Sequence, residues 1–390
     1  MGDFHNPARD DGVLLTAASA LAPLIRAQRD RIEQDRRLPQ ALVEQMRQAQ
    51  MFQLLLPRSL GGPEASPRTL IAVIQELARA DGSAGWCAAV TAIGGVLATN
   101  FAGPVAREVF GAGQIATGAI NPTGKAVAAP GGFLLSGRWS YCSGNEFADW
   151  VLLAAVIHDG DVPRKSSTGA PETCGLAVPR SAVTMIDTWH VSGLRGTGSH
   201  DLAVAGLFVP QARMMPMVPA PNADAAPLYR IAPINLLAAA LAAVTLGIAR
   251  AAIDALIELA AIKTPFAANG LLRERPQVHA NIGRAEAQIG AAHAFLLAAL
   301  DTLLMEAATS PSLTARAQAR AAATFAAEAS ARAVDLVHEA AGGSAIQESG
   351  VIARSFRDVH AATQHFVICS NSYETIGRVL LGLEPGVPRF

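Results

Sequence analysis

Residues 231–249 read IAPINLLAAALAAVTLGIA and carry no charge between Arg230 and Arg250. The run is nearly long enough to cross a membrane as a helix. It contains Pro233 and Asn235, however, and much of it is alanine, which gains little from lipid. A helix that is apolar on every side also occurs at the centre of a helical bundle. We therefore expect a helix buried in a bundle and no association with a membrane.

The chain on the C-terminal side of this run is divided into helical patterns by proline and glycine. Breaks fall at Pro276, around Pro311 and at Gly342-Gly343. With the apolar run they predict long helices over about 228–263, 275–308, 312–341 and 351–381. Short connections between such helices predict a four-helix bundle over 221–390, and its alanine-rich faces predict close helix approach and contacts between subunits.

The chain on the N-terminal side of the run shows two different sequence patterns. Between 115 and 220, short runs rich in β-branched and aromatic residues, such as FLLSGRWSYC, DWVLLAAVI, VTMIDTW and LAVAGLFVP, alternate with Gly, Pro, Asp and Ser clusters. They predict a middle antiparallel β domain, with VPAPNADAAP (218–227) as the linker that leaves it. Residues 1–114 read as helices, one of which opens at Ser66-Pro67. The predicted fold class is therefore a multidomain α+β protein.

Charge and cysteine usage exclude several classes of protein. The formal net charge is −1, with 31 basic and 32 acidic residues, so no basic stripe for nucleic acid is expected. The segment MGDFHNPARDDGV lacks the order of a signal peptide. The four cysteines lack CxxC spacing, which suits free thiols in a reducing compartment, and we expect a cytoplasmic protein. These cysteines are Cys87, Cys142, Cys174 and Cys369.

Five stretches carry a resemblance to a known family: PRSLGGPEASPRTLIAVIQELARADGSAGW (57–86), GRWSYCSGNEFADW (137–150), GLRGTGSHDLAVAGLFVP (193–210), RDVHAATQHF (357–366) and YETIGRVLLGL (373–383). In this order they resemble the acyl-CoA dehydrogenase superfamily over almost the whole chain. More narrowly, the chain is similar to the two-component (group D) flavin-dependent monooxygenases of that fold, such as 4-hydroxyphenylacetate hydroxylase, the secosteroid phenol hydroxylase and dibenzothiophene monooxygenase. Several of these motifs occur in both branches of the superfamily.

The last of the bundle helices separates the two branches. Many acyl-CoA dehydrogenases carry a catalytic glutamate nine residues after the arginine of an RD pair, and here that position is Phe366. The other location of that base lies in the first bundle helix, where no acid occurs between Asp224 and Asp254. The resemblance therefore favours the monooxygenases.

His365 stands where the monooxygenases that the chain resembles carry an active-site histidine. If residues 351–381 form one helix, His365 lies on the same face as Asp358, whereas His360 lies about 140° round the helix. That spacing disfavours a shared metal ion, no HExxH is present, and we predict no metal site. The alternative interpretation of His365 is a hydrogen-bonded core histidine, and we expect His360 to be structural.

The stretch GRWSYCSG offers a second catalytic candidate. Its alternation predicts a strand that brings Trp139, Tyr141 and Ser143 to one side. The resemblance places Ser143 against the reactive edge of the flavin, where a neutral hydroxyl can donate a hydrogen bond, and gives Trp139 a stacking or shielding role. The alternative is that Trp139 and Ser143 are ordinary core and turn residues.

Other flavin contacts are implied by the resemblance. The stretch GLRGTGSHD reads GxxGxG and leads into a strand, so it is not a dinucleotide fingerprint. In the family it lies near flavin or substrate, which makes Arg195 and Thr197 candidates. The parts of the bundle that would hold the flavin's phosphate-bearing tail across subunits contain Arg273, Arg275, Arg284, Gly342 and Gly343.

The substrate candidates are Trp86, Gly94, Tyr141 and Phe366. Several phenol-hydroxylating relatives carry a histidine eight residues after the tryptophan of GW, where this chain has Gly94. A general base contributes about 10²–10⁴ in rate. Either His365 does both jobs, or the substrate is not a simple phenol and is bulkier or differently placed.

The resemblance implies the oxygenase component of a two-component system. Reduced flavin (FMNH2 or FADH2) and O2 would form a C4a-hydroperoxyflavin that hydroxylates a small, largely apolar aromatic or heteroaromatic molecule. The chain shows no nicotinamide-binding pattern, so a separate NAD(P)H-dependent flavin reductase is expected, and the family suggests a homotetramer. The alternatives are an acyl-CoA dehydrogenase-like flavin dehydrogenase, an N- or S-oxygenase of the same fold, and a non-catalytic flavin carrier.

Overall fold

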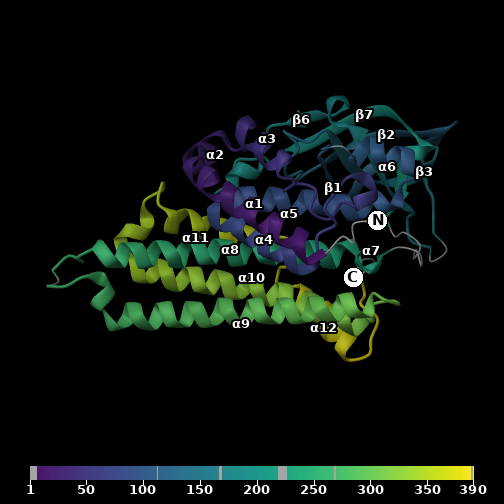
Figure 1. Ribbon diagram of the computed structural model, residues 1–390. Coiled ribbons are helices and arrows are strands. Elements are labelled where there is room, and N and C mark those ends of the chain that lie inside the picture. Colours follow the sequence, from purple (N-terminus) through teal and green to yellow (C-terminus); the bar gives the residue numbers. More distant parts are fainter. Residues whose placement is uncertain (1–6, 112, 167–168, 218–225, 268, 388–389) are drawn as a thin grey trace, which may run out of the picture.

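The computed structural model describes residues 7–111, 113–166, 169–217, 226–267, 269–387 and 390. Figure 1 shows the N-terminal helices lying along one side of a bundle of long helices, with the sheet beyond them. Most of the predicted linker 218–227 lies outside the described residues.

The N-terminal part consists of helices, and capping residues fix where two of them begin. The Ser66 side chain accepts a hydrogen bond from the backbone of Thr69 at the start of α4, and the Asp81 carboxylate accepts from Ser83 and Ala84 at the start of α5. The helices are α1 (Pro7–Ala27), α2 (Arg29–Asp35), α3 (Gln40–Gln48), α4 (Pro67–Ala80), α5 (Gly82–Leu97) and α6 (Gly103–Phe110), with 3₁₀ turns η1 (Arg58–Leu60) and η2 (Ala98–Asn100).

The middle part is one sheet with the order β6-β7-β2-β1-β3-β5-β8, and β4 pairs with β3. Its strands are β1 (Ala116–Ala129), β2 (Gly132–Trp139), β3 (Trp150–Asp159), β4 (Val162–Pro163), β5 (Thr173–Pro179), β6 (Thr184–Ile186), β7 (Asp201–Pro210) and β8 (Met214–Pro216). The 3₁₀ turns η3 (Arg180–Ala182), η4 (Arg195–Thr197) and η5 (Gln211–Arg213) lie between them.

One strand pair departs from the predicted antiparallel arrangement. β1 and β3 run parallel, whereas the other described pairs are antiparallel, so the sheet is mixed. The reason is the order of the strands. β3 runs opposite to β2, as consecutive strands usually do, but it lies on the far side of β1 and therefore runs in the direction of β1.

The C-terminal part is the bundle, and its first long helix confirms the expectation from the apolar run. Of the apolar window in α8, 94% is buried inside the protein. The bundle helices are α7 (Pro227–Arg230), α8 (Pro233–Ile262), α9 (Pro276–Glu306), α10 (Leu313–Ala341), α11 (Val351–Ala362) and α12 (Ser372–Leu380), with 3₁₀ turns η6 (Leu272–Glu274) and η7 (Gly342–Ile346).

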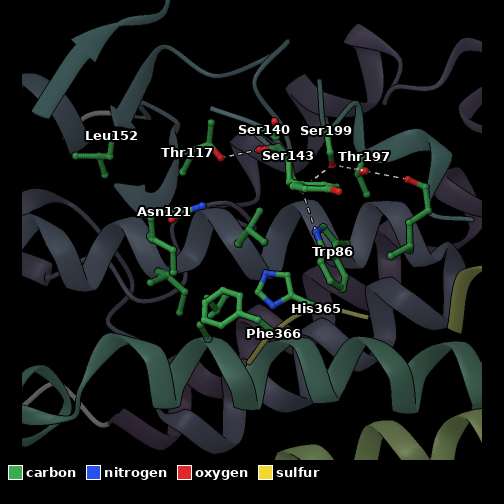
Figure 2. Close-up of a pocket in the computed structure, with 18 of the residues that line it drawn as sticks. Trp86, Thr117, Asn121, Ser140, Ser143, Leu152, Thr197, Ser199, His365 and Phe366 are labelled. Atoms are coloured by element: carbon green, nitrogen blue, oxygen red, sulfur yellow. Dashed lines mark hydrogen bonds between the residues drawn. The ribbon is translucent and has the colours of Figure 1, made fainter. Parts of the chain in front are cut away.

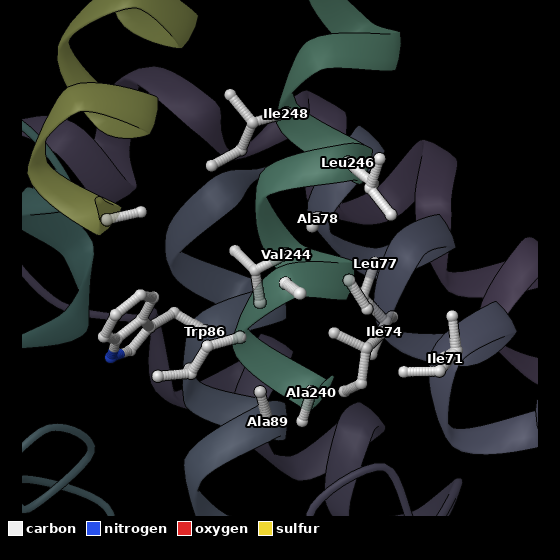
Figure 3. Close-up of a cluster of buried hydrophobic side chains, with 14 of the residues drawn as sticks. Ile71, Ile74, Leu77, Ala78, Trp86, Ala89, Ala240, Val244, Leu246 and Ile248 are labelled. Carbon is white, nitrogen blue, oxygen red and sulfur yellow. The ribbon is translucent and has the colours of Figure 1, made fainter. Parts of the chain in front are cut away.

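Small residues on α8 allow it to approach α4 closely. A Cβ atom added at Gly247 would lie 2.5 Å from the carbonyl oxygen of Gln75, so only glycine fits there. Figure 3 shows the result, with Ile74 and Leu77 of α4 packed beside Val244 of α8. By length and composition α5 with η2, α8 and α9 could each cross a membrane, but packing of this kind accounts for the apolar surface of α8.

The predicted fourth bundle helix over 351–381 is wrong as a single helix. α11 ends at Ala362 and α12 begins at Ser372. Between them the chain turns tightly, because the amides of Gln364 and His365 bond to carbonyls only three residues back. His365 consequently lies in this turn rather than on a helix.

Candidate active site

A cavity of about 700 Å³ lies between α5, β1 and the turn after α11. Figure 2 shows His365 and Phe366 on one side of it, with Ser143, Ser199 and Thr197 on the opposite side. Its walls are mainly apolar. Of the site residues predicted from sequence, the cavity brings together Trp86, Gly94, Tyr141, Ser143, Thr197, His365 and Phe366.

A chain of hydroxyl groups, formed by Ser143, Ser199 and Thr197, lines one side of the cavity. Trp86 Nε1 donates to Ser143 Oγ at 3.1 Å, Ser143 Oγ lies 2.7 Å from Ser199 Oγ, and Ser199 Oγ lies 2.7 Å from Thr197 Oγ1. Thr197 Oγ1 also donates to the carbonyl of Leu194 at 2.8 Å. The Asp81 cap fixes the first turn of α5 and thereby holds Trp86 in place.

The hydroxyl chain has a direction, because each hydroxyl carries one hydrogen. When Thr197 donates to Leu194, Ser199 donates to Thr197 and Ser143 donates to Ser199. Ser143 then offers a ligand only a lone pair. In the reverse direction Thr197 donates to Ser199, and Ser143 becomes a donor to the cavity. The Leu194 carbonyl tolerates the reversal because it also accepts from Trp189 Nε1 at 3.2 Å.

His365 faces the cavity as a neutral side chain. Burial, together with the positive charge of Arg320, lowers the pKa of His365 to about 4. The backbone N–H of Val367 donates to Nδ1 at 3.4 Å, which places the hydrogen of the neutral ring on Nε2. The imidazole meets the edge of Trp86 at 5.5 Å between ring centroids and stacks on Phe366 at 5.0 Å. His365 is therefore a hydrogen-bond donor through Nε2.

The helical-face argument that paired His365 with Asp358 is wrong, although His365 does reach the cavity. Asp358 is buried beneath the site, where its Oδ1 accepts from the backbone N–H of Leu194 at 2.6 Å. Burial and the nearby Asp81 raise the pKa of Asp358 to about 7. His360 bonds through Nε2 to Asp335 at 2.9 Å and is not among the cavity residues.

Trp139 does not lie in the cavity, and the expectation that Trp139, Tyr141 and Ser143 share one side is wrong. The Trp139 ring is buried in the sheet over Gly124, where any Cβ would overlap it, and its Nε1 donates to the carbonyl of Ala154 at 2.7 Å. The strand ends at Trp139, and Tyr141 has a left-handed φ of 63°. Tyr141 is consequently 74% exposed.

Arg195 is also absent from the cavity lining. Its Nε donates to the backbone carbonyl of Glu33 at 3.2 Å. The glycines around it serve close packing, since a Cβ at Gly193 would collide with the carbonyl of Arg357, and one at Gly196 would collide with Ile32. This packing fixes Leu194 and Thr197 against α11 and α5.

The residues predicted to hold the flavin tail lie at the end of the bundle where α8 leads into α9 and α10 into α11. Lys263 Nζ donates to the carbonyl of Ala341 there at 2.7 Å. Their predicted role involves a second subunit and stays a prediction. The three arginines, Arg273, Arg275 and Arg284, are exposed. The two glycines, Gly342 and Gly343, are also exposed, and a Cβ atom at either would meet open space.

The structure adds cavity residues that the sequence did not single out as candidates, among them Thr117, Asn121, Trp189, Ser199 and Gln364. A signal existed for Ser199, which lies two residues after Thr197 in the same glycine-rich stretch. None existed for Asn121. It lies where the β1–β3 pairing shifts register between Ala119 and Gly124, and that shift depends on the partner strand.

Comparison with known proteins assigns both helical parts to one family. Residues 13–108 match the N-terminal domain of acyl-CoA dehydrogenase, and residues 239–369 match its C-terminal domain. The chain is 29% identical to indole-3-acetate monooxygenase of Pseudomonas putida and 28% identical to the oxygenase component of FADH2-dependent resorcinol hydroxylase of Rhizobium sp. (strain MTP-10005), with 95% of each chain covered in both cases.

Among solved structures, the chain is similar to XiaF from Streptomyces sp. in complex with FADH2 and glycerol. The TM-score is 0.91 and the identity 27%, over 98% of both chains. The match includes the helices at both ends and the sheet between them. The chain therefore belongs to the acyl-CoA dehydrogenase family, and the relatives that it matches over nearly its whole length are monooxygenases and hydroxylases.

Proposed function

We propose that this protein is the oxygenase component of a two-component flavin-dependent monooxygenase. It takes reduced FMN or FAD from a separate NAD(P)H-dependent reductase and uses O2 to hydroxylate a small, largely apolar aromatic or heteroaromatic molecule. One observation carries the proposal. Within the described residues, the cavity lining holds no carboxylate that could act as the base of a dehydrogenase. Phe366 occupies the position of that base in the resemblance, and neutral His365 lies beside it.

The residues present fit a flavin ring. The cavity volume is in the usual range for organic ligands. A planar ring with a polar edge would meet the hydroxyl chain on one side and apolar groups of α5 and β1 elsewhere. Thr117 Oγ1 donates to the backbone carbonyl of Ser143 at 2.6 Å and so holds that hydroxyl in place. When bound, reduced flavin supplies the electrons that activate O2.

The protein's own groups bind, orient and exclude water. Ser143 would hydrogen-bond to the flavin edge, as acceptor or as donor according to the direction of the hydroxyl chain through Ser199 and Thr197. The Nε2–H of His365 would be available as a donor to an oxygen atom held in the cavity. The apolar walls keep water from the reacting atoms, which limits loss of the oxidising equivalents as H2O2.

The assembly state and the compartment are part of the proposal. A homotetramer is supported by α9, where only 33% of the apolar window is buried within one subunit. A cytoplasmic location is supported by the free thiols of Cys87, Cys142 and Cys174, all buried.

The test mixes the protein and reduced FMN or FAD with O2 in a stopped-flow instrument, without substrate. We expect H2O2 release to lag behind O2 uptake with the wild type, because the cavity shelters the reacting centre. Free flavin is the control and shows no lag. We expect Ser143→Ala and His365→Ala to shorten the lag. The proposal fails if the wild type shows none with either flavin.

A further inference from the structure

The side chains that line the cavity carry no formal charge. Within the part of the chain that the structure describes, the lining holds hydroxyls, amides, aromatic rings and aliphatic groups, but no Asp, Glu, Lys or Arg. His365, its one titratable imidazole, is neutral near pH 7 because burial lowers its pKa to about 4. A ligand in this cavity therefore meets neutral groups only.

The charged groups close to the site face other partners. Arg195 bonds to Glu33, and Asp358 accepts from the backbone of Leu194. Arg320 acts on His365 through its charge, but its side chain is itself buried and donates to Ser372 Oγ at 3.3 Å. Neither arginine lines the cavity, so neither makes direct contact with a ligand there.

Burying a charge is costly unless an opposite charge or several hydrogen bonds compensate for it. A carboxylate in this cavity would lose its hydration and gain only isolated neutral donors. An uncharged ring of the same shape loses far less. The relative from Pseudomonas putida is named for indole-3-acetate, which is a carboxylate. The neutral lining of this cavity argues for a different substrate preference in this chain.

We propose that the substrate is an aromatic molecule that is uncharged when bound, and that the cavity rejects arylcarboxylates of the same shape. Catalytic use of this selectivity rests on the proposed function, whereas the binding preference does not. Polar but neutral substituents have two partners, since Asn121 and Gln364 line the cavity and are exposed, which places them where it opens to solvent.

The same position offers a way to reverse the preference. Asn121 is exposed, so a longer cationic side chain can be accommodated there without entering the core. Asn121→Arg places a guanidinium at the opening, where it can pair with a carboxylate in two-point geometry. Asn121→Gln keeps the amide and adds length without charge, and is the matched control.

The experiment compares a nearly isosteric pair, indole-3-acetamide and indole-3-acetate, by isothermal titration calorimetry at pH 7.5 with the intact protein. We expect the amide to bind at least about tenfold more tightly, a factor that equals about 1.4 kcal/mol. Asn121→Arg should raise the ratio of acetate to amide affinity at least about threefold, an effect that salt weakens, and Asn121→Gln should not. A naphthylacetamide and naphthylacetate pair is titrated in parallel.

Equal or tighter binding of both carboxylates by the wild type overturns the inference. If that binding falls in Arg320→Met, Arg320 supplies the counter-charge and the cavity is not neutral in effect. Failure of both amides to bind up to their solubility also overturns it. This test is distinguishable from the test of the proposed function. Selective binding of the amides without oxygen transfer contradicts only the proposed function. Efficient oxygenation of the acetates contradicts only the inference about charge.

Discussion

His365 owes its neutral state partly to a cation that has few partners. Arg320 is 6% exposed, and its Nε and Nη1 have no hydrogen-bond partner among the described residues. Its charge disfavours a second charge on His365. We expect Arg320→Met to raise the pKa of His365 above about 4, as followed by NMR of the imidazole, and to move the acid limb of activity in the same direction.

The control for this prediction is Arg332→Met, since Arg332 lies on the same helix but is exposed and pairs with Glu328. It should leave the titration of His365 unchanged. A downward shift in Arg320→Met, or none at all, would contradict the account. The folded protein should tolerate the change, because replacing a poorly compensated buried charge with an apolar group is often neutral or stabilising.

Ser143 and Ser199 lie in one hydroxyl chain but differ in what their loss leaves behind. Ser143→Ala removes the acceptor of the buried Trp86 N–H, which should cost about 1–3 kcal/mol in the free energy of unfolding. Ser199→Ala leaves that bond intact and should cost less. Urea unfolding measures both. We expect both variants to release more H2O2 per O2 consumed, and equal stability losses would show that Trp86 finds another acceptor.

At the scale of the element, α5 carries two adjacent glycines with different roles, one in packing and one at the cavity. A Cβ at Gly95 would overlap the backbone of Leu55 and Leu56, whereas one at Gly94 would lie 3.2 Å from the carbonyl of Ala116 and project toward the cavity. We expect Gly95→Ala to destabilise the protein by more than about 3 kcal/mol. Gly94→Ala should fold, helped by about 1 kcal/mol of helix propensity, and bind bulky aromatics more weakly. Thermal unfolding and titration of a two-ring ligand distinguish them.

The contact between α11 and the 193–199 segment should depend on pH. The folded-state pKa of Asp358, about 7, lies above its unfolded value of about 3.9, so its contribution to stability is complete below the unfolded value and is lost as pH rises through about 7. Asp358→Asn keeps a carbonyl acceptor for Leu194 and cannot ionise. We expect its free energy of unfolding, relative to wild type, to rise from pH 5 to pH 8.

The matched control is Asp335→Asn, which changes an exposed carboxylate bound to His360 at 2.9 Å. Denaturant titrations at each pH give the difference between variant and wild type. A difference that stays flat, or that falls as pH rises, would contradict the role of Asp358. Other groups act on it, since Asp81 and Glu33 raise its pKa whereas Arg354 and the Leu194 N–H lower it.

Patterns within one element could be predicted from the sequence, and patterns set by distant partners could not. The all-apolar run predicted the buried α8, and proline and glycine predicted the ends of α9 and α10 to within a few residues. The break after Ala362 contains neither residue type. In the segment after the break Val367 and Ile368 are buried in the core, so the path of the chain here depends on packing against distant elements.

The site shows the same division. His365 and Ser143 were both predicted as active-site residues, and both line the cavity. The predicted position of Trp139 was wrong because the alternation of side chains was extended past the end of β2. The strand ends at Trp139, and the backbone takes a left-handed conformation at Tyr141. Asn121 could not be found because its orientation depends on the register of β1 against β3, strands that pair only after the chain has passed through β2.

At the scale of the whole molecule, α9 is a long apolar helix of which one subunit buries only about a third. It lies at the outer edge of the bundle in Figure 1. Its outward face carries exposed small residues, such as Ala287, Ala291 and Ala294, together with the exposed Phe295 and Met305. Small residues let two helices approach closely, and a second copy would remove this apolar surface from water.

We therefore expect the wild type to run as a tetramer of 40.4 kDa chains in light scattering coupled to size exclusion. Ala291→Glu places a charge in the middle of the outward face and should shift the mass toward dimer or monomer, because an unpaired charge in a close helix contact is costly. Ala20→Glu, on the exposed side of α1, is the control and should leave the mass unchanged. If the predicted tail contacts come from a partner subunit, Ala291→Glu should also weaken FAD binding. A monomeric wild type, or a tetramer that survives the charge, would show that α9 is not the contact between subunits.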